Sequence, residues 1–187
     1  MTQFETAYND IYKLHTQLLD TSRTRIKPTL VVFSAIPGSG KSELTKRLVS
    51  EHNFLRIANK DVRELIAKTH HEDDVSVEGY TLWLLDNLTE QTKYSIVFDR
   101  NIDQWYTPSK EWAERNGYRY VLVRIDVQRE ILEQRLLERE KDREAKAFEV
   151  LDFYAKQHEE IGIQIDPSIT LSDNYDLDAA AKAIVKF

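Results

Sequence analysis

The sequence contains no cysteine among its 187 residues. This absence excludes a disulfide framework, a thiol nucleophile and a zinc site with cysteine ligands. No apolar run approaches the length of about 20 residues that a membrane-spanning helix needs. The N-terminus, Met-Thr-Gln-Phe-Glu, lacks the charged and then apolar pattern of a secretory signal. We therefore expect a cytoplasmic protein with no membrane segment.

An excess of positive charge is also missing. The formal net charge is −6 and the sequence pI is about 5.4. Nucleic-acid-binding domains are commonly basic, so nucleic acid is not indicated as a general partner, although the net charge would hide a small basic groove. The content of 41% hydrophobic and 31% charged residues is typical of one soluble domain with a substantial core.

The most informative motif is a glycine-rich loop between an apolar run, Leu30–Phe33, and an amphipathic segment. The loop reads Ala35-Ile-Pro-Gly-Ser-Gly-Lys-Ser42, which matches the Walker A pattern except that Ala35 replaces the first glycine. Lys41 would meet the β- and γ-phosphates of a nucleotide, and the Ser42 hydroxyl would bind Mg²⁺. An ordinary turn with a surface lysine is disfavoured because the motif and its flanks agree. The candidate phosphate-binding residues are Pro37, Gly38, Ser39, Gly40, Lys41 and Ser42.

Segments with the periodicity of strands and helices alternate along the rest of the chain. This alternation predicts an α/β fold with a mainly parallel sheet, whose carboxyl edge would carry the phosphate-binding loop. Thr107 and Pro108 indicate a helix start, with Thr107 as the cap. We expect a leading helical extension over 1–27 and the main domain over 28–187. The expected strands are 29–34, 54–58, 95–99, 118–126 and 168–171. The other expected helices are 41–51, 61–69, 81–93, 129–139, 145–161 and one from about residue 177.

Two carboxylates follow predicted strands and are candidates for the chemistry. Asp61 comes just after the second strand and could deprotonate an attacking hydroxyl, cap a helix, or do both. Asp99 ends the third strand and could position Mg²⁺ through water, hold an acceptor, or cap a turn. Asn101 follows on the same loop as a substrate or structural contact.

Several arginines could bind anions near this edge. Arg135 and Arg139 share a helix face and could close over the phosphates as a lid, or could belong to a solvated face of ion pairs. Arg63 lies near Asp61 and could hold an anionic acceptor or point into solvent. Four aromatic residues could line an acceptor pocket: Tyr80, Trp83, Trp105 and Tyr106. Helical spacing favours a position in the core for Tyr80 and Trp83.

With these residues, the chain resembles the small P-loop kinases, a group that includes bacteriophage polynucleotide 5′-hydroxyl kinases and zeta toxins. The resemblance covers about residues 29–172. It rests on the glycine-rich loop and on the following residues: Asp61, Phe98-Asp99-Arg100-Asn101, Trp112, Gly117-Tyr118, Asp126, Arg135 and Arg139.

The resemblance implies a P-loop NTPase fold, a three-layer sandwich like that of nucleoside and nucleotide kinases, with a helical lid at about 129–146. It also implies ATP as the phosphoryl donor. By resemblance, Lys41 and Ser42 are the nucleotide-binding lysine and serine, Asp61 is the general base, Asp99 is the second aspartate and Arg139 is the lid arginine.

One departure concerns the acceptor. In this group an arginine usually follows the base by three residues, whereas here Arg63 is two residues after Asp61 and Glu64 takes the third position. Either the loop is one residue shorter or the acceptor differs.

Three functions remain open. The first is a kinase that uses ATP and Mg²⁺ to phosphorylate a hydroxyl of a small molecule or of a nucleic-acid 5′ end. The second is an ATP-binding or ATP-hydrolysing regulatory module without a specific acceptor. The third is a toxin-type kinase that acts on a nucleotide sugar. The sequence does not indicate an oligomeric state.

Overall fold

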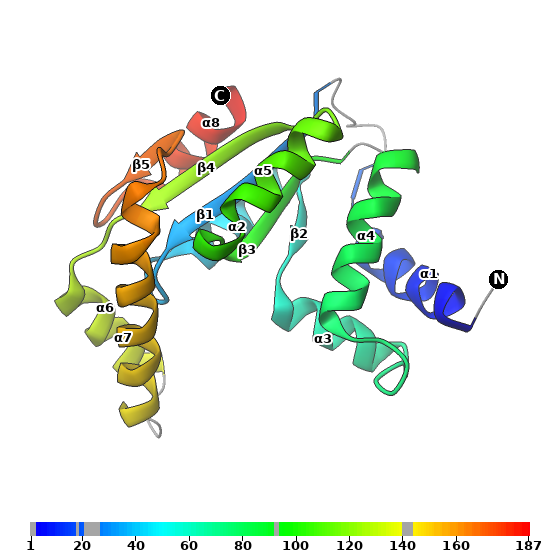
Figure 1. The fold of residues 1–187 in the computed structure, drawn as a ribbon, viewed down its shortest axis with the longest axis horizontal. Coiled ribbons are helices and arrows are strands. Elements are labelled where there is room, and N and C mark those ends of the chain that lie inside the picture. The colour runs from blue at the N-terminus through cyan, green and yellow to red at the C-terminus, as the bar shows by residue number, and fades with distance from the viewer. Residues whose placement is uncertain (1–2, 18, 21–26, 92–93, 140–143) are drawn as a thin grey trace.

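The structure is a computed structural model that describes residues 3–17, 19–20, 27–91, 94–139 and 144–187. Within these residues the chain forms a central sheet with helices on both faces (Figure 1). Residues 1–2, 18 and 21–26 of the expected leading extension lie outside the described residues.

The sheet has five parallel strands in the order β2-β3-β1-β4-β5. The central strand β1 is buried along its whole length, as expected for an apolar strand that is covered on both faces. All five predicted strands are present, and the α/β fold with a parallel sheet is confirmed. Their bounds are β1 Thr29–Ala35, β2 Leu55–Ile57, β3 Ile96–Asn101, β4 Arg119–Ile125 and β5 Ile169–Leu171.

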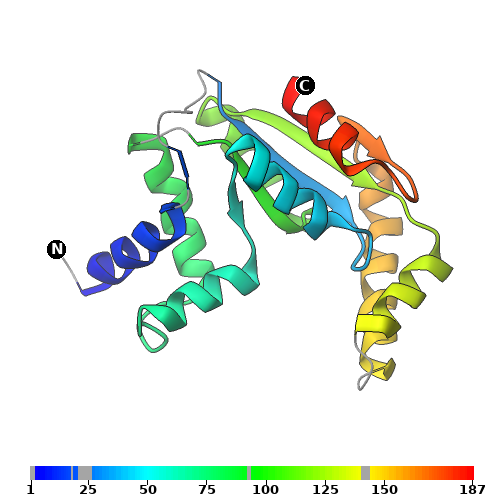
Figure 2. The ribbon, with the colours of Figure 1, turned by 180° about the vertical axis from the view of Figure 1, so that it is seen from behind.

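Helices cover the two faces of the sheet unequally. Helices α2 and α8 pack together on one face, which is nearer the viewer in Figure 2, and α5 covers β4 on the other. Helices α1, α3 and α4 contact one another beside the β2 edge. Helices α6 and α7 lie together at the other end of the sheet. The helix bounds are α1 Gln3–Thr16, α2 Lys41–His52, α3 Asn59–Lys68, α4 Val77–Gln91, α5 Tyr106–Arg115, α6 Arg129–Arg139, α7 Glu144–Glu160 and α8 Leu177–Lys186.

The alternation of side chains along β1 divides the interior into two cores. Leu30 and Val32 face the core that includes α1, α3, α4 and α5, while Val31 and Phe33 face the core under α2 and α8. Ala7 and Ile11 of α1 are fully buried in the first core. The leading helix therefore packs into the same body as the sheet.

Several predicted helix starts were wrong. Helix α3 begins at Asn59 after Ala58, so Asp61 lies in the first turn and is not the cap. Helix α5 begins at Tyr106 because a 3₁₀ turn over 103–105 runs directly into it, which places Thr107 inside the helix. Helix α4 begins at Val77, where the Ser76 Oγ accepts a hydrogen bond from the Gly79 N–H.

Helix α6 spans the predicted residues 129–139, and α7 follows it. The predicted lid therefore consists of α6 and the beginning of α7, except for residues 140–143, which lie outside the described part. Among the described helices, none is both long enough and apolar enough to cross a bilayer.

Candidate active site

The glycine-rich loop connects the carboxyl end of β1 to the first turn of α2. Gly38 and Gly40 have φ values of 91° and 93°, in the region that favours glycine. A Cβ on Gly40 would lie 3.3 Å from the hydroxyl of Tyr175. Gly40 is the N-cap of α2, so the first N–H groups of this helix point into the loop, where an anion is favoured.

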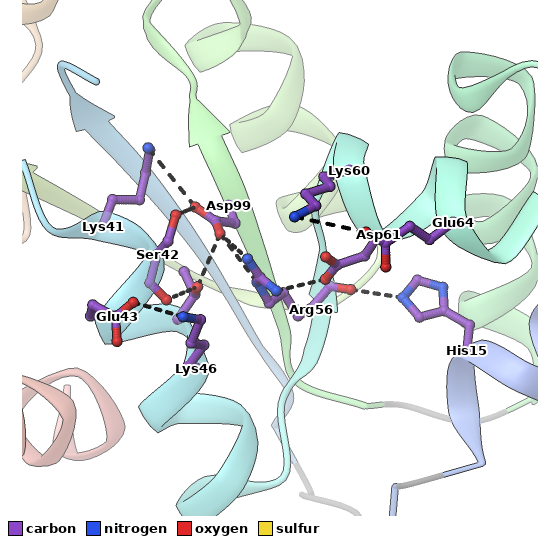
Figure 3. Close-up of polar contacts among 11 residues, drawn as sticks. His15, Lys41, Ser42, Glu43, Lys46, Arg56, Lys60, Asp61, Glu64 and Asp99 are labelled. Carbon is purple, nitrogen blue, oxygen red and sulfur yellow. Dashed lines mark hydrogen bonds and ion pairs between the residues drawn. The ribbon is translucent and has the colours of Figure 1, made fainter. Parts of the chain in front are cut away.

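Asp99 is the centre of the polar contacts beside this loop (Figure 3). Its side chain is only 3% exposed. The Ser42 hydroxyl donates to Asp99 Oδ1 at 3.1 Å, and the Thr45 hydroxyl donates to Oδ2 at 3.2 Å. Lys41 Nζ lies 3.9 Å from Oδ1. The structure thus brings together the three predicted residues Lys41, Ser42 and Asp99.

Lys41 is a largely buried cation. Burial lowers the pKa of its ammonium, and the nearby Arg139 and Arg56 lower it further, while Asp99 raises it. The carboxylate of Asp99 therefore partly offsets the cost of burying the ammonium beside two arginines. The ammonium and the two arginines therefore favour the binding of additional negative charge, such as that of a nucleotide phosphate.

Arg56 joins the two predicted carboxylates, a feature that the sequence analysis missed. Its Nε donates to Asp99 Oδ2 at 3.1 Å, and its Nη2 contacts the same oxygen. Its Nη1 donates to Asp61 Oδ2 at 2.7 Å. The available signal was one charged residue within the apolar strand Leu55–Ile57. Thr45 was also missed, although it lies one turn after Ser42.

The oxygen atoms beside the loop suit a hard cation. Ser42, Thr45 and Asp99 bring two hydroxyls and a carboxylate together, and Mg²⁺ prefers oxygen ligands of this kind. Among the described residues, no group of three or more His, Asp or Glu side chains forms a separate metal site. A magnesium ion at this loop would therefore take further ligands from phosphates and water, as it commonly does.

The two predicted lid arginines have different surroundings. Arg135 Nη1 donates to the carbonyl of Gly38 at 3.1 Å, so α6 contacts the loop directly. Arg139 ends α6 and lies near enough to Lys41 to lower its pKa. Arg129 belongs instead to an exposed set of ion pairs, with Glu133 and Asp152.

Asn101 has structural partners. Its amide donates to Asp103 Oδ2 at 3.1 Å and to Gln157 Oε1 at 3.3 Å, and its carbonyl oxygen accepts from the Asp103 N–H. These bonds fasten the end of β3 to α7. A role for Asn101 in binding substrate stays a prediction.

A cleft of about 520 Å³ lies between α4 and α5 against the sheet. Arg63 lines it next to Asp61, and Phe98 and Arg100 line it on either side of Asp99. Lys41, Ser42 and the two carboxylates are not among its lining residues. The cleft therefore contains neighbours in sequence of the two carboxylates and extends along the sheet between α4 and α5.

The cleft combines aromatic and cationic side chains. The Arg100 guanidinium lies 5.1 Å from the ring centre of Phe98 and 5.5 Å from that of Trp105. The buried Nε of Arg100 has no hydrogen-bond partner among the described residues.

Only one of the four candidate aromatic residues lines this cleft. Trp105 does so, whereas Tyr80 is buried in the core and Trp83 packs against Tyr8. Tyr106 contacts the ring of Tyr120.

A protein-family comparison matches residues 15–166 to the model described as Zeta toxin. The chain belongs to the zeta toxin family. This membership covers most of the chain and confirms the resemblance to small P-loop kinases. No curated protein matches the sequence.

Solved structures resemble this zeta toxin family member in fold. A provisionally assigned kinase from Chloroflexus aurantiacus has a TM-score of 0.59 at 12% identity, covering 86% of this chain and 98% of that one. An uncharacterized protein from Eubacterium ventriosum has a TM-score of 0.53 at 16% identity, covering 84% and 96%. The family and the P-loop fold support a phosphotransferase of the kinase type in general.

Proposed function

We propose that this protein transfers the γ-phosphoryl group of ATP to a hydroxyl group of an acceptor. The observation that carries the proposal is the chain of contacts from Lys41 and Ser42 through Asp99 and Arg56 to Asp61. It connects a phosphate-binding loop to a second carboxylate, which phosphoryl transfer to a hydroxyl would use.

In this proposal Lys41 and the N–H groups of the loop bind the β- and γ-phosphates. The acceptor oxygen forms a bond to the γ-phosphorus, the bond from that phosphorus to the bridging oxygen of ADP breaks, and the acceptor proton moves to Asp61. Arg139 and Arg135 hold charge on the phosphates from the side of α6. Mg²⁺ bound at Ser42 would neutralise phosphate charge, as it does in other P-loop enzymes.

We propose that the acceptor occupies the cleft between α4 and α5, with its hydroxyl directed at Asp61. Arg63 and Arg100 favour an acceptor that carries an anionic group, because both line this cleft. Phe98 and Trp105 offer faces for an apolar or planar portion. Asp99 and Asn101 would act at the boundary between the acceptor and the loop.

A transfer assay with γ-labelled ATP, Mg²⁺ and a panel of acceptors tests this proposal. The panel contains 5′-hydroxyl RNA and DNA oligonucleotides, nucleosides, nucleoside monophosphates and nucleotide sugars. We expect label on one class, and a fall in turnover of about 100-fold or more for Asp61→Asn with ATP still bound, because a general base contributes roughly that factor. Asp73→Asn, at an exposed turn, is the matched control. Full turnover in Asp61→Asn would contradict the assignment of the base.

A further inference from the structure

Arg56 links two parts of the molecule that otherwise make separate contacts. Asp99 is fixed to the loop helix α2 by the hydroxyls of Ser42 and Thr45. Asp61 is on α3, which packs mainly against α1 and α4. Arg56 reaches both carboxylates from β2, between them (Figure 3). This one guanidinium therefore links Asp61 to the phosphate-binding loop through Asp99.

The shape of a guanidinium suits this position. Nε and Nη2 bind Asp99, and Nη1 remains for Asp61. The group is planar and rigid, so it fixes the direction as well as the separation of the two carboxylates. A lysine ammonium is a single point of charge on a flexible stem and does not present two edges.

Arg56 is itself held firmly. Its neighbours Leu55 and Ile57 are buried, and β2 pairs in register with β3, the strand that carries Asp99. The Nε2 of His15, on α1, donates to the Arg56 carbonyl at 2.7 Å. The Arg56 side chain is only 21% exposed, so little solvent competes for its hydrogen bonds.

We propose that Arg56 is a positioning residue for phosphoryl transfer, holding Asp61 in line with the phosphate-binding loop by bridging it to Asp99. This inference rests on the proposed function and adds to it a residue outside the Walker A loop, the base and the lid. Arg56 acts through Asp61, whose carboxylate meets the acceptor. A displacement of about 1 Å in such a group can lower a rate by about 100-fold.

A double-mutant cycle with Arg56→Gln and Asp61→Asn tests whether Arg56 acts through Asp61. We expect Arg56→Gln to lower kcat by about 30-fold or more, since the base loses its alignment. In the Asp61→Asn background the same change should lower kcat by less than about 3-fold, because the aligned group is already missing. The affinity for a non-hydrolysable ATP analogue with Mg²⁺, measured by calorimetry, should change by less than about 3-fold, because binding energy lies with the loop.

Two further variants separate positioning from charge and from fold stability. Arg56→Lys keeps the charge beside Asp99 but should not restore kcat, since one ammonium cannot serve both carboxylates. It also carries the test if Arg56→Gln does not fold. Arg119→Gln is the matched control, because Arg119 is a partly buried strand arginine that binds Thr29 Oγ1 at the amino end of β1. Thermal melting of each variant confirms that it is folded.

Three results would overturn the inference. Multiplicative effects in the double-mutant cycle would mean that Arg56 acts independently of Asp61. Full activity of Arg56→Lys would mean that charge alone matters. A loss confined to ATP affinity would place Arg56 in nucleotide binding. Failure of the wild-type protein to phosphorylate any acceptor would instead remove the proposed function, and the inference with it, so the two failures are distinct.

Discussion

At the scale of single residues, the site depends on how a few buried charges are paired. Asp99 receives hydrogen bonds from two hydroxyls and from Arg56, with Lys41 nearby. A buried carboxylate is tolerated when it is paired and hydrogen-bonded in this way. The same contacts place a cation and two hydroxyls at the opening of the loop, where a phosphate and its metal ion would bind.

Gly40 provides a test of the loop at this scale. Gly40→Ala should lower the free energy of unfolding by about 1–3 kcal/mol, because a side chain is strained at its positive φ. It should also weaken binding of an ATP analogue, since the new Cβ would lie 3.3 Å from the Tyr175 hydroxyl and disturb the loop. Denaturant unfolding and calorimetry measure the two effects.

Gly117→Ala is the matched control for this change. Gly117 also has a positive φ, 71°, but no atom within 4 Å of the added Cβ. The Gly117→Ala variant should have a lower free energy of unfolding and an unchanged affinity for the nucleotide. Equal affinity of Gly40→Ala and wild type would contradict our account of the loop.

Residues whose role is local were predictable from the sequence. Gly38, Gly40, Lys41 and Ser42 form one continuous motif, so their spacing alone predicts a phosphate-binding loop. Arg56 was not predictable, because its two partners are brought to it by strand pairing and by the turn into α3. The cleft between α4 and α5 depends likewise on how distant helices pack.

At the scale of elements, hydrophobic periodicity predicted the strands well because all five lie in one parallel sheet and most are deeply buried. Helix starts were less predictable. Asp61 and Thr107 are suitable cap residues, but α3 and α5 each begin earlier, where the preceding strand or 3₁₀ turn leads directly into the helix. Local cap preference was overridden by the path that the chain takes between packed elements.

Helix α1 is joined to the site by a partly buried histidine, His15. A carbonyl can only accept, so His15 Nε2 carries the proton given to the Arg56 carbonyl. Burial lowers the pKa of His15, against smaller opposite effects from this hydrogen bond and from Asp61. The neutral ring then accepts a hydrogen bond at Nδ1 from the Tyr80 hydroxyl, at 3.0 Å.

This lowered pKa predicts a pH dependence of stability. Between the unfolded value of about 6.5 and the lower folded value, the unfolded chain binds more protons at His15 than the folded chain does. The contribution of His15 to the free energy of unfolding is therefore fully present above about pH 6.5 and is lost as the pH falls below that value. His15→Gln should show a smaller decrease between pH 7.5 and pH 5.5 in urea unfolding than wild type.

The exposed His70 provides the control for this prediction. His70→Asn suits its positive φ of 58° and should keep the wild-type pH dependence. The assignment of His15 would be wrong if the His15→Gln and wild-type curves were parallel over this range.

At the scale of the whole molecule, the parallel sheet brings the ends of β1, β2 and β3 together at one edge. The order β2-β3-β1 places the strand of Arg56 and the strand of Asp99 beside the strand that leads into the loop. Helices α6 and α7 approach the same edge from the far side, through Arg135 and Gln157. A nucleotide bound at these strand ends would therefore connect the β2 side of the sheet with the side that carries α6 and α7.

A bound nucleotide should stabilise the entire fold. An ATP analogue with Mg²⁺ at about 100 times its Kd should add about 2.7 kcal/mol, which for a chain of this size raises Tm by roughly 5–10 °C. Lys41→Met should abolish most of this rise, because it removes the cation from the loop. Lys46→Met, on the exposed face of the same helix, should retain it. Differential scanning fluorimetry measures these shifts, and equal shifts in both variants would contradict the role of Lys41.

The most direct test of phosphoryl transfer is a single-turnover experiment with γ-labelled ATP, Mg²⁺ and the acceptor panel. It measures how the label divides between an organic product and inorganic phosphate. Our account predicts that wild-type protein places most of the label on a hydroxyl of one acceptor class, and that Asp61→Asn loses this product while still binding ATP. Label that appears only as inorganic phosphate with every acceptor would contradict the account and favour an ATP-hydrolysing regulatory module.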